Sequence, residues 1–452
     1  MKLSRYFGTP TFCRSAVLLT LPILAQNLLT SSFSLVDTLM ISSLGTTALT
    51  AMGLAASWIQ LLNVIMMGIT SAAGVLVAQF WGARELRQVR RSYGGGLSFC
   101  LLVSLLFLIL TTTRPGLVMS FYSNDQAVVE AGKHYLQVVA FGFPALGLQH
   151  TANAVLRSTE QVRTPMYGTI VSVLTNILFN YMLIFGHFGA PRLGMVGAAL
   201  ASCIANWTGV AVTYALAIAR GTVLRTSLRR ALDFDRPFLK QYFVVAWPIM
   251  ANELLWGGGT ALLNMIYGHM GTLEYAALTM CNTLENIITT VFLSLANSAN
   301  VLVGKEIGRD RKDRAYQNAL AITCWTPVIA ALFGLGMLAL RGPITGIFQQ
   351  TPEVTGLAMK LIVIMALTLP LRFLQYIHIC GILRAGADGK KAAFYDFLGV
   401  WCISIPVAFL GLAVKAPFLW VYLAVVLSDS LVKDVLVLRR FFSKKWMIKI
   451  SG

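Results

Sequence analysis

Two acidic residues lie inside long apolar segments, where a carboxylate has few natural partners. Asp37 lies in LPILAQNLLTSSFSLVDTLMISSLG, and Glu253 lies in PIMANELLWGGG. An ionisable side chain at membrane depth is costly and marks an ion or substrate pathway. The chemistry that such a group supports is reversible binding of a proton or of a monovalent cation. We therefore expect Asp37 and Glu253 to bind the coupling ion of a membrane process.

Three neutral polar side chains are expected to join Asp37. Asn176 and Asn180 are four residues apart in NILFNYMLIFG, so they share one face of a helix. Ser202 adds a hydroxyl from a segment of small residues, GMVGAALAS, that permits close helix packing. The resulting oxygen-rich pocket suits a proton or a hard cation, and Asp37, Asn176 and Asn180 are the expected ligands if that cation is Na+.

The second half of the chain holds further polar residues within apolar segments. Glu285, Tyr376, His378 and Asp396 are the other candidates for a polar cleft. Arg372 also lies inside a predicted helix and needs a counter-charge, and the sequence leaves open which acid supplies it. The cysteines show no metal-binding spacing and are expected to be small core residues. We also expect no cofactor and no catalytic residue.

The elements that position these residues are predicted to be membrane-spanning helices. Hydrophobic residues make up 57% of the 452 residues and charged residues only 12%, which is not a soluble composition. A helix needs about 20 apolar residues to cross a bilayer. Twelve segments of this kind are predicted, at residues 15–42, 46–80, 88–113, 126–155, 163–186, 194–220, 240–269, 272–304, 313–340, 352–383, 391–413 and 416–441.

The chain contains an internal repeat with an offset of 226 residues. The matching residues include Pro22-Ile23 with Pro248-Ile249, Gly45-Thr46 with Gly271-Thr272, and Gly82 with Gly308. A repeat of this length indicates two pseudo-symmetric six-helix lobes. We expect an N-terminal lobe at 1–220, a basic cytoplasmic linker at 221–239 and a C-terminal lobe at 240–452.

The charge pattern favours a membrane protein over a nucleic-acid-binding protein. The formal net charge is +18, but most of the 36 Lys and Arg lie at the two ends and in every second connection between the predicted helices. The positive-inside rule then places both termini in the cytoplasm. We expect a multi-pass protein of the plasma membrane that contacts lipid, binds no nucleic acid and acts as a monomer.

Several motifs together resemble multidrug and toxic compound extrusion (MATE) transporters. They are VLVAQFWGARE, LRSTEQVRTP, NILFNYMLIFG, ANELLW and LRAGADGKKAAFYDF, and they occur in the family's order along nearly the whole chain. The similarity is greatest to bacterial members with a glutamate in the seventh helix, here Glu253. The resemblance implies twelve helices in two lobes, with Asp37, Asn176, Asn180 and Ser202 at the N-lobe site.

The expected function is secondary antiport, in which organic cations leave the cytoplasm in exchange for H+ or Na+ by alternating access. No GxxxxGK[ST] motif for ATP is present in the sequence. A flippase for lipid-linked oligosaccharides or similar precursors, with a like two-lobe architecture, is the alternative. A membrane-embedded enzyme is disfavoured because neither DDxxD nor HxxxxD occurs. The sequence leaves open the natural substrate, the choice of H+ or Na+, and the stoichiometry.

Overall fold

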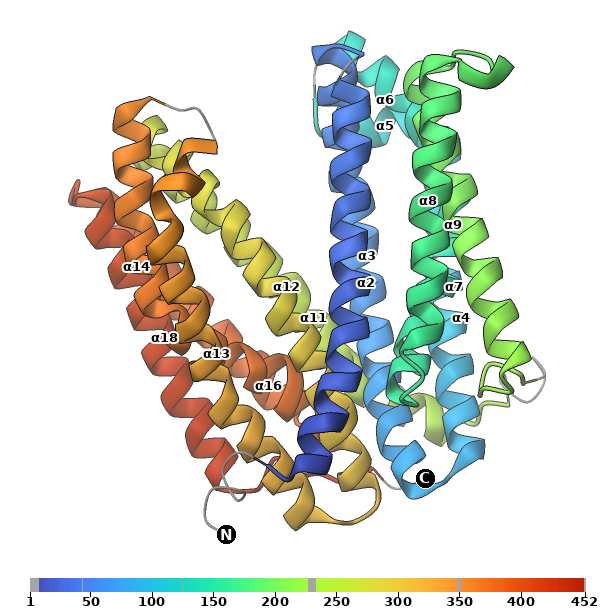
Figure 1. The fold of residues 1–452 in the computed structure, drawn as a ribbon, viewed down its shortest axis with the longest axis vertical. Helices are drawn as coiled ribbons and strands as arrows, with labels where there is room; N and C mark the ends of the chain where they lie inside the picture. Colours follow the sequence, from blue (N-terminus) through green and yellow to red (C-terminus); the bar gives the residue numbers. More distant parts are fainter. Residues whose placement is uncertain (1–7, 43, 124, 227–232, 348–350, 451–452) are drawn as a thin grey trace. The chain divides into compact units, whose positions relative to one another are not determined.

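The computed structural model describes residues 8–42, 44–123, 125–226, 233–347 and 351–450, all drawn as coloured ribbon in Figure 1. Part of the expected basic linker, residues 227–232, lies outside this set. Every regular element of the described chain is helical. In chain order they are α2 (Pro10–Ser42), α3 (Thr46–Ala83), α4 (Leu86–Thr113), α5 (Pro115–Ser120), α6 (Gln126–Val139), η1 (Ala140–Gly142), α7 (Phe143–Ser158), α8 (Arg163–Phe185), η2 (His187–Gly189), α9 (Gly194–Ala219), α11 (Arg236–Met270), α12 (Thr272–Gly308), α13 (Lys312–Ile347), α14 (Pro352–Ile377), η3 (His378–Ile382), α15 (Leu383–Ala385), α16 (Gly389–Phe397), η4 (Leu398–Ser404), α17 (Ile405–Ala413) and α18 (Phe418–Phe442).

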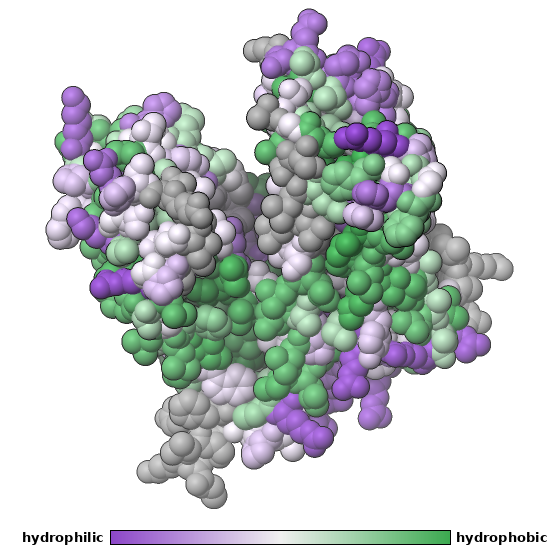
Figure 2. All heavy atoms as spheres, turned by 45° about the horizontal axis from the view of Figure 1, so that its top comes forward, coloured by the Kyte–Doolittle hydropathy of each residue, from purple (hydrophilic) through white to green (hydrophobic). Residues whose placement is uncertain are grey.

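All twelve segments expected to span the membrane are helical in the described structure. Nine helices there are long and apolar enough to cross a bilayer. The segment at 126–155 is divided by the short 3-10 helix η1, and α18 carries Asp429, Lys433 and Asp434 within its apolar sequence. On the visible face of each unit, hydrophobic side chains cover the middle and hydrophilic side chains gather toward the ends (Figure 2). This distribution is the one expected when the middle of each unit contacts the apolar core of a bilayer and its ends contact the polar interfaces.

The chain forms two compact units. The N-terminal unit comprises residues 21–250, and the C-terminal unit comprises residues 1–20 together with 251–452. Thus the start of α2 packs with the C-terminal unit, where Thr20 Oγ1 donates to Ser298 Oγ at 2.9 Å. The start of α11 packs with the N-terminal unit, where Tyr242 donates to the carbonyl of Ile69 at 2.8 Å. The two helices α2 and α11 therefore each contribute to both units.

Proline interrupts three of the long helices that carry the polar residues. Pro22 lies in α2, Pro248 in α11 and Pro370 in α14. Each proline removes one backbone hydrogen bond, which permits bending of the helix at that point. In α14 the disturbance continues into a π-helical turn, η3, that begins at His378. A second π-helical turn, η4, follows α16. Such turns are uncommon and are often found at functional sites.

Small residues bring α8 and α9 into close contact within the N-terminal unit. A Cβ atom added at Gly168 would collide with Thr213, and one added at Gly209 would lie 2.8 Å from the Cβ of Ser172. Only glycine permits this approach, which is typical of packing between membrane helices. The two helices consequently present their polar side chains to each other at short range.

The described part of the basic linker is fixed to the first residues of α4. Arg91 contacts Asp233 at 3.2 Å and Asp235 at 3.1 Å, and Arg87 contacts Asp233 at 3.0 Å. Hydrogen bonds from Arg87 and Arg91 hold the pKa of the Asp233 carboxyl below its ordinary value. These contacts lie within the N-terminal unit and tie the linker to it.

Candidate functional site

The four polar residues expected in the first half converge on one point of the N-terminal unit. Asn180 donates from Nδ2 to Asp37 Oδ1 at 2.5 Å and to Asn176 Oδ1 at 2.9 Å. Ser202 donates to Asp37 Oδ2 at 3.2 Å and accepts from Asn176 Nδ2 at 3.3 Å. We call these four residues the N-terminal cluster. They come from α2, α8 and α9, so the close contact of α8 with α9 positions three of the four side chains.

Only neutral donors contact the carboxylate of the N-terminal cluster. Among the described residues, no Lys, Arg or His forms an ion pair with Asp37. Asn176 and Asn180 are fully buried, and Asn180 Oδ1 is a buried oxygen without a hydrogen-bond partner. A buried acceptor that receives no hydrogen bond destabilises the folded protein. The four side chains thus leave one buried amide oxygen able to accept a further hydrogen bond or to coordinate a cation.

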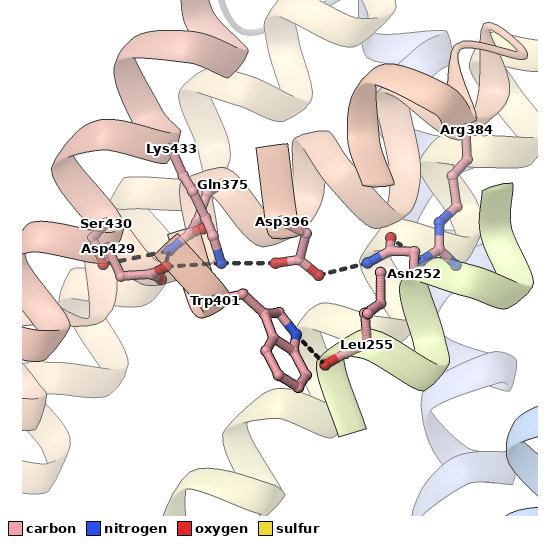
Figure 3. Close-up of polar contacts among 9 residues, drawn as sticks. All are labelled: Asn252, Leu255, Gln375, Arg384, Asp396, Trp401, Asp429, Ser430 and Lys433. Carbon is pink, nitrogen blue, oxygen red and sulfur yellow. Dashed lines mark hydrogen bonds and ion pairs between the residues drawn. The ribbon is translucent and has the colours of Figure 1, made fainter. Parts of the chain in front are cut away.

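A larger charged network occupies the C-terminal unit. Glu253, on α11, forms an ion pair from Oε1 to Arg384 Nη2 at 2.8 Å, and both side chains are at most 10% exposed. Arg384 also donates to Asn252 Oδ1 at 3.3 Å, and Asn252 donates to Asp396 Oδ2 at 2.6 Å. Figure 3 shows Arg384, Asn252 and Asp396 aligned in this order. The second predicted acid, Glu253, is thus paired with a cation, whereas Asp37 is not.

The network continues from Asp396 into α18. Lys433 Nζ lies 2.7 Å from Asp396 Oδ1 and 2.9 Å from Asp429 Oδ1. Gln375 on α14 donates to Asp429 Oδ2 at 3.3 Å (Figure 3). We call Glu253, Arg384, Asn252, Asp396, Lys433 and Asp429 the C-terminal network. It connects α11, α15, α16 and α18 through charged hydrogen bonds, with α14 attached at its far end.

The other expected cleft residues have different positions. Glu285 on α12 pairs with Arg372, accepting from Nη1 at 2.8 Å, which answers the open question of the Arg372 counter-charge. Tyr376 contacts the ring of Phe373 edge-on, with centroids 6.1 Å apart. His378 is fully buried, with Nε2 at 3.3 Å from Thr323 Oγ1. The structure thus brings Asp396 together with Glu253 in one network but places Glu285 and His378 in separate contacts.

The interpretation of the sequence missed Lys433 and Asn252 as members of the network. The charge pattern alone places Lys433 among the basic residues at the cytoplasmic end of the last predicted helix. Its spacing of four residues from Asp429, inside an apolar helix, was the available signal, because such a pair shares one helical face. Asn252 directly precedes Glu253, and its signal was the internal repeat described next.

The repeat is preserved in the contacts of the two halves. Asn252 occupies the position that Gln26 holds in the first half, 226 residues earlier. Gln26 accepts from Arg157 Nη2 at 2.6 Å, just as Asn252 accepts from Arg384. The halves differ in charge, because the position of Glu253 is occupied by Asn27 in the first half. Only the C-terminal arginine therefore has a carboxylate partner at this position.

No classical metal site accompanies these clusters. In the described ranges, no group of three or more His, Cys, Asp or Glu side chains is arranged to hold a metal ion. None of the seven cysteines, all of which lie in the described ranges, forms a disulfide.

Comparisons with known proteins agree with this architecture. The family profile described as MatE matches residues 22–182 and 248–410. "Uncharacterized transporter YisQ" of Bacillus subtilis (strain 168) is 26% identical over 437 residues, which cover 95% of this chain and 94% of YisQ. "Probable multidrug resistance protein NorM" of Listeria monocytogenes serovar 1/2a (strain ATCC BAA-679 / EGD-e) is 24% identical over 393 residues, which cover 86% of this chain and 85% of that protein.

A solved structure supports the same fold. The structure described as "Crystal structure of MATE in the bent conformation" has a TM-score of 0.86 and 18% identity, and the match covers 98% of each chain. This agreement confirms the expected all-helical, MATE-like membrane fold.

Proposed function

The chain belongs to the MatE family, and from this premise we propose that it exports lipophilic organic cations from the cytoplasm in exchange for H+ or Na+. Proteins of this family are membrane transporters, so the prediction that the chain is not an enzyme is confirmed. The finer parts of the proposal are the cationic substrate, the coupling ion and the residues that bind it.

The observation that carries the proposal is the uncompensated carboxylate of Asp37. Its partners in the N-terminal cluster are neutral, so the ionised cluster carries one net negative charge in a region of low dielectric constant. Such a charge attracts a lipophilic cation far more strongly than it would in water. When Asp37 takes up a proton or Na+, the attraction ends, because the cluster becomes neutral. Substrate and coupling ion therefore compete for one charge, which is the requirement for antiport.

Glu253 has a different role in this proposal. The ion pair of Glu253 with Arg384 has no net charge. The Glu253 carboxylate therefore attracts a cation only when Arg384 moves away. We assign Glu253 to the conformational step of alternating access, in which α11 bends near Pro248 and the pair is made or broken. The same acid marks the bacterial subtype with a glutamate in the seventh helix, to which we assign the chain.

The remaining features of the proposal concern topology and assembly. Basic residues at the ends and in alternate connections favour cytoplasmic N- and C-termini in the plasma membrane. We propose that one chain suffices for transport, since each six-helix lobe supplies one of the two acids.

The flippase alternative is weakened by the state of the buried cations in the C-terminal unit. A pyrophosphate-linked lipid needs cationic side chains that are free to bind it. In the described C-terminal unit, Arg372, Arg384 and Lys433 are all paired with carboxylates. Their positive charge is already neutralised, so they offer an anionic headgroup little attraction.

The proposal is tested by binding of ethidium, a fluorescent lipophilic cation, to the purified protein over a range of pH. We expect the affinity of the wild type to fall as pH falls, and that of Asp37→Asn to be weak and independent of pH. Added Na+ at constant ionic strength shows whether Na+ competes as well. The matched control is Glu353→Gln, which removes an exposed acid at the start of α14. If Asp37→Asn binds ethidium like the wild type at every pH, the assignment of Asp37 is wrong.

A further inference from the structure

Helix α18 carries three charged residues, Asp429, Lys433 and Asp434, within its apolar sequence and ahead of the basic pair in its last turn, which is unusual for a membrane helix. Two of them, Asp429 and Lys433, belong to the C-terminal network. Lys433 is 3% exposed and is shared between Asp396 and Asp429, so two carboxylates face one ammonium group. Charged side chains at membrane depth are expensive and are rarely retained without a functional role. The third charged residue, Asp434, takes no part in these ion pairs.

Asp434 is a buried carboxyl group without a hydrogen-bond partner. Asp434 is 5% exposed, and neither of its two buried carboxylate oxygens forms a hydrogen bond in the structure. It lies one helical turn after Ser430, on the face of α18 that meets α14. There Gln375 donates to Ser430 Oγ at 3.4 Å.

The groups that face Asp434 are few. On α18 itself they are Asp429 and Lys433, and Lys433 in turn holds Asp396 of α16. On α14 the group is the backbone N–H of Gln375, which lies outside hydrogen-bonding geometry. The ring of His378 is directed elsewhere, since its Nδ1 lies 2.8 Å from the carbonyl oxygen of Leu374.

The surrounding backbone is shaped to admit the charged pair beside Asp434. Gly399 lies in the π-helical turn η4, and a Cβ atom there would overlap both Lys433 and Asp429. A glycine at this position lets η4 approach the ion pair closely. The cluster is thus enclosed by an irregular helical turn of the kind that is frequent at functional sites.

The charges of this region do not balance when every acid is ionised. Asp396, Asp429 and Asp434 carry three negative charges against the single positive charge of Lys433. The nearby Arg384 and Arg372 are already neutralised by Glu253 and Glu285. An unpaired carboxylate in a buried site is far less stable than the neutral acid.

We propose that Asp434 is a second proton-binding site of this protein, located in the C-terminal unit and separate from the N-terminal cluster. A proton fits this site better than a metal cation. A hard cation takes several oxygen ligands, and the described part of the chain has no such group of acidic side chains around Asp434. Proton loss breaks the O–H bond of the carboxyl, transfers the proton to water and leaves a carboxylate.

The new carboxylate competes for Lys433 with Asp396 and Asp429. When the contact between Lys433 and Asp396 weakens, Asp396 is free to rearrange its hydrogen bond to Asn252. Asn252 lies beside Glu253 on α11. A change in the charge of Asp434 on α18 therefore alters the hydrogen bonds of the helix that carries Glu253. This coupling role rests on the proposed antiport, whereas proton binding at Asp434 does not.

The site is tested on the full chain in lipid nanodiscs by infrared difference spectroscopy, without any substrate. The pH is stepped across the neutral range and the carboxylic acid C=O band is recorded. We expect the wild type to lose a band as pH rises, and Asp434→Asn to lack this component. Asp434→Glu should keep a band at a shifted frequency, and Asp37→Asn should retain the wild-type component. Glu353→Gln is the control and should match the wild type.

The outcomes separate the two proposals. If Asp434→Asn gives the wild-type spectrum, or if Asp434→Glu leaves every band unshifted, proton binding at Asp434 is refuted. If Asp434→Asn does not fold, the band shift in Asp434→Glu decides the question alone. A wild type that shows the Asp434 band but transports no cation would refute the proposed antiport and leave this site intact. In a transporting protein, we expect the number of protons released on ethidium binding to fall by one in Asp434→Asn.

Discussion

Replacing Arg384 with Met should destabilise the protein far more than the equivalent change at Arg157. Both arginines donate to an amide side chain on the first helix of their half. Only Arg384 also neutralises a carboxylate, Glu253, and both partners of this pair are at most 10% exposed. Removing one partner of a buried ion pair costs about 3–5 kcal/mol, because it leaves an unpaired buried charge. Losing a hydrogen bond from a charged group costs about 1.5–3 kcal/mol.

The expected difference between Arg384→Met and Arg157→Met is therefore about 2 kcal/mol in the free energy of unfolding. The double variant Glu253→Gln with Arg384→Met removes both charges, and should recover a similar amount relative to Arg384→Met alone. Reversible denaturant unfolding in mixed micelles, followed by tryptophan fluorescence, measures the wild type and the three variants. Equal destabilisation by the two arginine variants, with no recovery in the double variant, would refute an ion pair that stabilises the C-terminal unit.

Three further predictions concern other parts of the structure. Asn180→Leu removes the amide that donates to the ionised Asp37 carboxylate, at a cost of about 1.5–3 kcal/mol. Because the ionised form loses a donor, ethidium affinity should begin to fall at a higher pH than in the wild type; an unchanged pH dependence would contradict this. Gly399→Ala should cost about 1–3 kcal/mol through overlap with the α18 ion pair, whereas Gly336→Ala, which has open space, should cost little in the same unfolding assay. Arg91→Met should release the linker, measured as faster amide hydrogen exchange at residues 233–236. Because the pKa of Asp233 is lowered, its ion pairs with Arg87 and Arg91 persist at neutral pH and are lost only as pH falls below roughly 4. Release of the linker at a clearly higher pH would contradict this.

The N-terminal cluster could be predicted from the sequence because its signals are local. Asn176 and Asn180 share a helical face by their spacing, and the small residues around Ser202 indicate close packing between helices. Asp37 was conspicuous as an acid in an apolar segment. The spacing alone does not show that the helices carrying Asp37, Asn176 and Ser202 pack together. The family resemblance supplied that part of the prediction.

The C-terminal network was predicted only in part, because its contacts join residues far apart in the chain. Lys433 reads as a cytoplasmic charge at the end of a helix, since nothing in the sequence indicates that Asp396 lies 2.7 Å away. Likewise, Arg372 had several acids available, and only the packing of α12 with α14 selects Glu285. The unpartnered state of Asp434 depends on every neighbouring side chain, so no pattern in the sequence reveals it.

The exchange of helix ends between the units was also not predicted. The repeat suggested a division between 220 and 240, whereas the compact units change at residues 20/21 and 250/251. Pro22 and Pro248 lie close to these points. Hydrophobic periodicity identifies a helix but does not say which neighbours each of its turns contacts, and this explains the difference.

The most direct test of the account is efflux of ethidium from vesicles that contain the purified protein, under separately imposed proton and sodium gradients. We predict gradient-driven efflux by the wild type, loss of efflux in Asp37→Asn, and dependence on whichever ion competes with ethidium for binding. Efflux by Asp37→Asn at the wild-type rate, or no gradient-driven transport by a folded wild type under either ion, would contradict coupling of cation export through the Asp37 carboxylate.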